Sequence, residues 1–68
     1  MQLEKLIGAR LQAVRVSKQI KQETAAQKLG ISQSRLSRIE NGQLLNISLA
    51  VIMAYCRLLE ISVIDILS

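Results

Sequence analysis

Five polar side chains recur at helical spacing in the middle of the chain and could share one hydrogen-bonding face. They are Gln33, Ser34, Ser37, Arg38 and Asn41. Aliphatic residues of the same stretch are predicted to point the other way, into a core, and they are Ala26, Leu29, Ile31, Leu36 and Ile39. A polar and cationic face of this kind favours non-covalent binding of a partner.

The chain offers little for catalysis or metal binding. It has no His, and its five Asp and Glu residues are scattered. No nucleophile and base occur at a spacing that would predict a catalytic pair. The single thiol, Cys56, lies among apolar residues, so it is predicted to be buried, and it has no partner for an internal disulfide. Without His or a Cys cluster there is no zinc-site spacing. We therefore expect no enzyme activity, no metal and no cofactor.

The positive charge is concentrated in the first half of the chain. Residues 1–38 carry eight Lys or Arg against two Glu, a net charge of +6, whereas residues 39–68 carry one Arg against three acidic residues, a net charge of −2. Lys and Arg gain affinity for a polyanion by releasing the counterions condensed on its phosphates. The asymmetry suits a nucleic-acid partner, and the alternative is an ordinary solvated basic surface.

Length and composition favour one small helical domain over residues 1–68. Half of the 68 residues are apolar, there is no Pro, and Tyr55 is the only aromatic residue. A core of this size is marginal, so oligomerisation is expected. The longest uncharged run, residues 41–56, contains several polar residues and is shorter than the roughly 20 apolar residues that span a bilayer. No cleavable leader is visible, so a cytoplasmic location is expected.

Apolar spacing and capping residues predict an all-α domain of five helices. The expected ranges are about 3–16, 21 or 22 to 30, 32–41, 48–59 and 63–67. Gly30 suits the left-handed end of the second helix, and Ser32, Ser48 and Ser62 are candidate N-caps for the three helices that follow. Two short helices joined by a tight turn at Gly30 form a helix-turn-helix.

The helix over 48–59 carries more apolar residues than one side can bury. One stripe, expected to face inward, comprises Leu49, Ile52, Met53, Cys56 and Leu59. A second stripe comprises Ala50, Val51, Ala54, Tyr55 and Leu58. We expect part of the second stripe to contact another copy of the chain, joined by residues of the C-terminal tail. The expected contact residues are Val51, Ala54, Tyr55, Leu58 and Val63, with some of Ile61, Ile64 and Ile66. The alternative is that the C-terminal tail wraps this helix more fully.

With these residues in register, the sequence resembles the Cro and phage-repressor helix-turn-helix family, often called XRE-like. The residues that carry the resemblance are Arg15, Gln22, Ala26, Gly30, Ile31, Ser32 and Glu40-Asn41-Gly42. The tail over 61–67, with its serine cap, resembles the closing helix of the family. Each of these matches alone is weak evidence for the family, but the whole set at fixed spacing is specific to it.

The resemblance implies roles for individual residues. It implies an ion pair between Arg15 and Glu40 that locks the first helix to the recognition helix. It also implies that the recognition helix, about 32–41, enters the major groove of DNA, where Gln33 and Ser34 touch base edges and Ser37 and Arg38 lie one turn further on. A glutamine there can bond adenine through both atoms of its amide, and Arg38 could read guanine or hold a phosphate. The implied phosphate contacts are Gln22, Asn41 and Gln43, with Lys21, Arg35 and Lys28 as weaker candidates.

Three positions depart from the family pattern. Gln19 and Glu60 stand where glycine is usual, and Lys21 replaces the usual cap of the second helix. The first inter-helix turn is therefore expected to be less well capped, at a cost of about 1 kcal/mol. The loop over 43–46 also lacks the basic residues that many relatives place against the DNA backbone.

These observations predict a DNA-binding regulator that acts as a homodimer on a pseudo-palindromic operator. Two recognition helices would then enter successive major grooves about one helical turn apart. The alternative is an antitoxin-like module that binds a partner protein, such as a toxin, through the apolar helix over 48–59 and the C-terminal tail. No small-molecule ligand is evident. Small phage repressors, restriction-modification controllers and antitoxins all share this layout.

Overall fold

The computed structural model describes residues 3–44 and 47–67 and is all-helical over those residues. Its helices are α1 (Leu3–Ser17), α2 (Gln22–Leu29), α3 (Gln33–Glu40), α4 (Leu49–Leu58) and α5 (Val63–Leu67). The predicted all-α class and five-helix order are confirmed, and each observed range agrees with its prediction to within about a residue. Of the loop over 43–46, residues 45 and 46 lie outside the described part of the chain.

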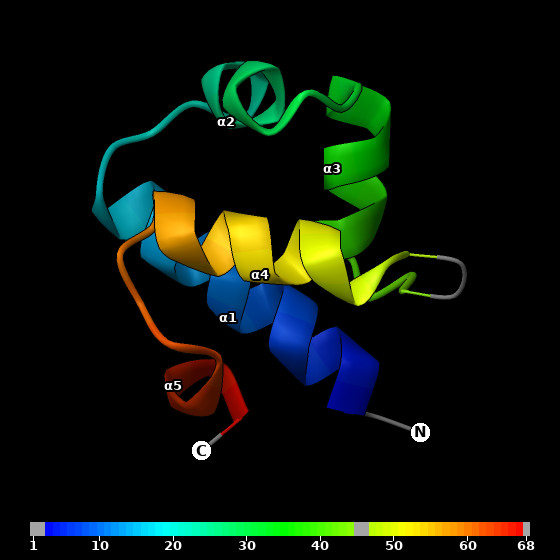
Figure 1. The fold of residues 1–68 in the computed structure, drawn as a ribbon, viewed down its shortest axis with the longest axis vertical. Helices are drawn as coiled ribbons and strands as arrows, with labels where there is room; N and C mark the ends of the chain where they lie inside the picture. The colour runs from blue at the N-terminus through cyan, green and yellow to red at the C-terminus, as the bar shows by residue number, and fades with distance from the viewer. Residues whose placement is uncertain (1–2, 45–46, 68) are drawn as a thin grey trace.

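The helices pack against one another in four pairs with extensive contacts. α1 packs against α3 and α5, and α2 packs against α3 and α4. Figure 1 shows α2 and α3 together at one end of the molecule, α1 and α4 across its middle, and α5 near the opposite end. The helix-turn-helix and the C-terminal helix α5 therefore lie at opposite ends of the molecule.

The turn between α2 and α3 follows its sequence signals. Gly30 ends α2 with φ 71° and ψ 28°, in the left-handed region that favours glycine. The amide of Ile31 donates to the carbonyl of Ala26 at 3.1 Å, which completes the helix end. Ser32 then caps α3, because its Oγ accepts from the amide of Arg35 at 3.0 Å. Both cap predictions at this turn are confirmed.

The later helices are capped as predicted. The Oγ of Ser48 accepts from the amide of Val51 at 3.3 Å. At α5 the cap is reciprocal: the amide of Asp65 donates to Ser62 Oγ at 3.2 Å, and the amide of Ser62 donates to Asp65 Oδ2 at 3.1 Å. This capping box satisfies two amides that the first turn of a helix leaves unpaired. It helps a helix of only five residues to form.

The two positions where glycine was expected do adopt a glycine-like backbone. Gln19 and Glu60 both have φ 60°, and a residue with a Cβ pays roughly 1–2 kcal/mol for that conformation. Lys21, at the N-cap of α2, makes no side-chain cap hydrogen bond. The expectation of a poorly capped turn between α1 and α2 is therefore confirmed.

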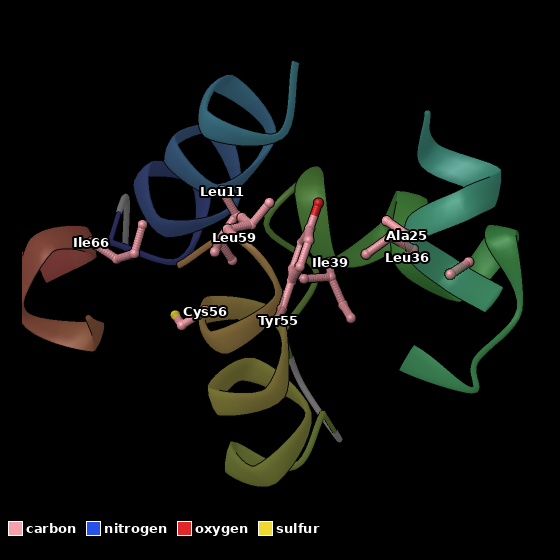
Figure 2. Packing of buried hydrophobic residues seen from close by; sticks show 9 residues of the cluster. Leu11, Ala25, Leu36, Ile39, Tyr55, Cys56, Leu59 and Ile66 are labelled. Atoms are coloured by element: carbon pink, nitrogen blue, oxygen red, sulfur yellow. The ribbon is translucent and has the colours of Figure 1, made fainter. Parts of the chain in front are cut away.

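The buried hydrophobic residues form one cluster contributed by all five helices and the turn after α4 (Figure 2). Its members are Leu11, Ala25, Ala26, Leu36, Ile39, Tyr55, Cys56, Leu59 and Ile66. The predicted inward residues of the helix-turn-helix belong to it or, for Leu29 and Ile31, pack half-buried against it. Cys56 is buried as expected, and burial raises the pKa of its thiol.

The predicted faces of α4 require correction. Tyr55 was expected on a contact surface, and this is wrong because the side chain is fully buried at the centre of the cluster (Figure 2). Leu49 and Met53 were expected inside, but they are 67% and 42% exposed. The buried side of α4 lies between the two predicted stripes. Apolar residues nearly encircle this helix, so their spacing could not select one face.

Two glycines let α1 approach the end of α3 closely. A Cβ placed on Gly8 would lie 2.5 Å from the carbonyl oxygen of Ile39, and one on Gly42 would lie 2.6 Å from Cα of Lys5. Gly42 also has φ 83°. Only glycine fits both positions without a shift of the backbone. This contact sets the angle at which α3 leaves the body of the protein.

None of the described helices combines the length and the apolarity that crossing a membrane requires.

Candidate nucleic-acid interface

A buried ion pair joins α1 to the last residue of α3. Arg15 Nε donates to Glu40 Oε2 at 2.7 Å, and Arg15 Nη2 donates to Oε1 at 3.1 Å. The remaining nitrogen, Nη1, donates to the carbonyl of Ile20 at 2.7 Å. Arg15 is 7% exposed and Glu40 is 4% exposed. The pair implied by the family resemblance is present, in the bidentate form that fixes geometry as well as charge.

The carboxylate of Glu40 connects four helices. Besides Arg15 of α1, it accepts hydrogen bonds from the hydroxyl of Tyr55 in α4 and from Nε2 of Gln22 in α2, the latter at 3.1 Å. Burial by itself would raise the pKa of Glu40, but the hydrogen bonds from Arg15, Tyr55 and Gln22 outweigh it and hold the pKa below its ordinary value. Glu40 therefore stays ionised at neutral pH.

Tyr55 is the residue that sequence reasoning misplaced. Burial, and then its hydrogen bond to Glu40, raise the pKa of its phenol, so the hydroxyl remains a donor. A buried tyrosine hydroxyl needs a polar partner. The signal available in the sequence was that the only aromatic residue stands in an otherwise aliphatic helix, but its partner lies 15 residues away.

The polar chain continues from the buried carboxylate to the surface. Gln22 Oε1 accepts from Gln33 Nε2 at 3.3 Å. Gln33 is the first residue of α3 and is exposed, whereas Gln22 is half-buried at the first position of α2. The structure therefore brings the residue predicted to contact a base into direct contact with one predicted to hold a phosphate.

Most of the outer face of α3 is exposed. Gln33, Ser34 and Arg38 are exposed, Ser37 is half-buried, and Asn41 is exposed directly after the helix. At 100° per residue, Ser34, Ser37, Arg38 and Asn41 share the side opposite the buried Leu36 and Ile39. The five residues predicted from their spacing thus form one surface, with Gln33 at its edge nearest α2.

The other predicted phosphate contacts lie around this surface. Lys21 is exposed just before α2, and Gln43 is exposed two residues after Asn41. Arg35 is half-buried on α3, and helical geometry places it on the flank away from Gln33. The amide of Gln43 donates to the carbonyl of Arg38 at 2.9 Å, which holds the chain close to the end of α3.

A hollow lies between α1, the segment after α3, α4 and α5. An apolar groove of about 280 Å³ is lined by Ile7, Leu44, Ile47, Leu49, Ile52, Cys56, Val63, Ile66 and Leu67. Two of its lining residues, Leu49 and Leu67, are exposed, and α4 and α5 also expose Met53 and Ile64. Val63 lines this groove, whereas Leu58 borders a different hollow beside Ile20 and Thr24. Two of the residues predicted for a contact with another copy, Val63 and Leu58, therefore line different hollows.

Among residues 3–44 and 47–67, no three His, Cys, Asp or Glu side chains gather in a way that could hold a metal ion.

Comparisons with known proteins agree with this geometry. A family model described as helix-turn-helix matches residues 11–66, which include α2, α3 and α4. Among solved structures, the chain is similar to the crystal structure of the clp gene regulator ClgR from C. glutamicum. The two are 29% identical, the match covers 96% of this chain and 82% of that chain, and the TM-score is 0.87. No curated protein matches the chain.

Proposed function

The chain belongs to the XRE-like helix-turn-helix family, and on that premise we propose that it is a transcriptional regulator that recognises a specific DNA sequence. α3 would lie in the major groove, with Gln33, Ser34, Ser37 and Arg38 against base edges. The observation that carries the proposal is the outer face of α3, which is polar and unpacked while its inner face is fixed to α1, α2 and α4 through Glu40.

The groups around α3 would fix the register of the protein on the duplex. Lys21 and Gln22 at the start of α2, and Asn41 and Gln43 after α3, flank the recognition surface on two sides, and Arg35 lies on its far flank. Contacts of this kind to phosphates position a protein without reading sequence. The net charge of +6 on residues 1–38 supports the attraction to DNA.

The regulator would act as a homodimer on a pseudo-palindromic operator. Four large apolar residues, Leu49, Met53, Ile64 and Leu67, are between 42% and 73% exposed. Large exposed apolar side chains on a small protein favour an interaction surface. Because these residues belong to α4 and α5, a second copy could pack on them without covering the outer face of α3. We therefore propose the contact at the groove and the α4 and α5 residues exposed beside it, retaining Val63 and Ile64 from the predicted residues and adding Leu49, Met53 and Leu67.

A partner protein that occupies the same groove is the second candidate, in the manner of an antitoxin bound to its toxin. The groove favours neither occupant by its chemistry, since both would bury apolar surface. Sedimentation of the isolated chain at tens of micromolar distinguishes them: a dimer supports self-association, and a monomer that fails to shift duplex DNA supports the partner-protein function.

Selection of bound duplexes from a random pool tests the proposed function. We expect an enriched inverted repeat whose half-site centres lie about 10 base pairs apart. On that duplex, Gln33→Ala should cost about 1–3 kcal/mol of binding free energy and relax the preference at one base pair. Gln12→Ala, which removes an exposed glutamine from α1, is the matched control and should bind as the wild type does. A pool without any enriched motif would refute sequence-specific binding.

A further inference from the structure

We propose that the outer face of α1 is a docking site for a helix of another protein, one whose apolar stripe is flanked by acidic residues. Four exposed residues form this face, and they are Leu6, Ala9, Ala13 and Val16. None of them lines the apolar groove or belongs to α3, so the face is a different surface from both. The proposal goes beyond DNA binding and does not depend on it.

The four residues follow the spacing by which helices pair. They stand three, four and three residues apart, which places them in one row along a helix, as the two apolar positions of a heptad repeat are placed. Leu6 and Val16 are 44% and 57% exposed, although apolar side chains of this size are more often buried. A row of apolar side chains about 15 Å long therefore faces outward on α1.

The inner side of α1 is occupied by the rest of the domain. Gly8, Leu11 and Arg15 are buried, and Arg15 holds Glu40 at the end of α3. At 100° per residue, these three residues lie on the side of α1 away from the outer face. A helix docked on the outer face of α1 therefore leaves the contact between α1 and α3 in place.

The two alanines in the middle of the face favour a helix as the occupant. A side chain that ends at Cβ lets another helix approach closely, because the distance between two packed helices depends on the side chains at their contact. Larger apolar side chains of the partner can then fit between Leu6 and Val16, as knobs fit into holes. The face thus favours a partner helix with a stripe of large apolar residues.

The residues beside the face determine the charge that suits the partner. Lys5 and Gln12 border it on one flank, and Arg10 and Ser17 border it on the other. Arg10 Nη1 also donates to the carbonyl of Ile66 at 2.9 Å, which holds this side chain toward α5. In paired helices, charges at such flanking positions select the partner. Neither flank carries an acidic residue, so acidic residues on the partner are complementary to Lys5 and Arg10.

A second copy of α1 is disfavoured as the occupant. Two α1 helices that packed in parallel through this face would place Lys5 of one copy beside Arg10 of the other. Two antiparallel α1 helices would place the two Arg10 side chains near each other. Like charges brought together in an interface suppress pairing. The charges therefore favour a different protein as the partner.

Two designed peptides test the proposal by NMR titration of the labelled protein without DNA. Each peptide has about four heptads with leucine at both apolar positions, and the flanking positions carry glutamate in one peptide and lysine in the other. We expect the glutamate peptide to bind at least about tenfold more tightly than the lysine peptide. Its largest amide shift changes should fall on the four residues of the outer face of α1.

Three variants locate the binding site. Ala13→Glu places a carboxylate in the middle of the face and should weaken binding of the glutamate peptide at least about tenfold. Gln27→Glu adds the same charge at an exposed position of α2, and this matched control should bind the peptide as the wild type does. Leu49→Glu, which changes the apolar groove, should also bind it as the wild type does.

Three results would overturn the proposal. Equal affinity for the two peptides would show that charge does not select the partner. The largest shift changes on α2 and α3, or on α4 and α5, would place the peptide on another surface. A dimer that Ala13→Glu converts to a monomer in sedimentation would assign the face to self-association. The wild-type titration requires no variant to fold, and because it contains no DNA, its failure would leave the proposed function intact.

Discussion

The α2–α3 end and the α4–α5 side both expose side chains on short helices, but the interactions of these side chains differ between the two regions. At the first, exposed polar groups connect to a buried carboxylate through hydrogen bonds, as Gln33 does through Gln22 to Glu40. At the second, the exposed leucines Leu49 and Leu67 border an apolar groove. Matching base edges needs groups with fixed direction, whereas covering apolar surface needs area and shape. The buried polar network gives this fixed direction to side chains at the α2–α3 end.

The largest effect should come from removing the carboxylate that holds the recognition side. Glu40→Ala leaves Arg15 buried and unpaired and removes an acceptor from Tyr55 and Gln22, so it should cost about 3–5 kcal/mol of unfolding free energy. A domain of this size has little more stability than that. Urea unfolding followed by circular dichroism checks the loss.

Two further variants should have smaller effects than Glu40→Ala and serve as comparisons for it. Tyr55→Phe removes only one hydrogen bond to the same carboxylate and should cost about 1.5–3 kcal/mol. Glu23→Ala, an exposed glutamate in the first turn of α2, should change stability by less than about 0.5 kcal/mol. If Glu40→Ala lowers the unfolding free energy no more than Glu23→Ala does, the hydrogen-bond network around Glu40 does not stabilise the fold.

The two sides of α4 should respond differently to a new charge. Leu58 is half-buried beside α2, so Leu58→Glu should destabilise the fold by about 1–3 kcal/mol. Leu49 is 67% exposed at the groove, so Leu49→Glu should leave the unfolding free energy nearly unchanged and abolish the dimer in sedimentation. Ala13→Glu, at an exposed position of α1, is the control and should keep the dimer. A Leu49→Glu variant that still dimerises would remove the groove from the interface.

Acid pH should lower the unfolding free energy of the protein by protonating Glu40. Its pKa is lower in the folded protein than its ordinary value of 4.5. The ionised group therefore contributes stability above that value, and the contribution is lost as the pH falls from about 4.5 through the folded-state pKa. Urea unfolding at pH 7, 5, 4 and 3 should show this loss in the wild type and less of it in Glu40→Gln. Parallel pH profiles for the two proteins would assign the acid sensitivity to other groups.

The smallest effect should come from the strained turns. Glu60 has φ 60°, so Glu60→Gly should raise the unfolding free energy by about 0.5–1 kcal/mol, the relief of strain being partly offset by a more flexible unfolded chain. Glu60→Ala keeps the Cβ and should not show this gain. A thermal unfolding midpoint that rises equally in both variants would point to the lost charge rather than the backbone.

The sequence predicted what depends on neighbouring residues. Gly30 and the caps Ser32, Ser48 and Ser62 are local signals, because the groups they satisfy lie within a few residues. The ion pair between Arg15 and Glu40 spans 25 residues and was expected only through family resemblance. The outer face of α3 was predictable because polar and apolar residues are cleanly separated along it.

The rest depends on packing between distant segments. Nothing near Gly8 in the sequence shows that the end of α3 crosses it, although a glycine inside an apolar helix is a hint of close approach. Tyr55 was misplaced because its hydroxyl is satisfied by a carboxylate from another helix. The faces of α4 were misjudged because nearly every residue of that helix is apolar, so only its neighbours decide which side is buried.

An NMR titration of the labelled protein with the selected duplex tests the central claim most directly. We predict that the largest amide shift changes fall at the start of α2 and along α3, at Gln22, Gln33, Ser34 and Arg38, while Leu49 and Ile64 change little. Saturating changes centred on α4 and α5, with α3 unaffected, would contradict the assignment of α3 as the surface that reads DNA.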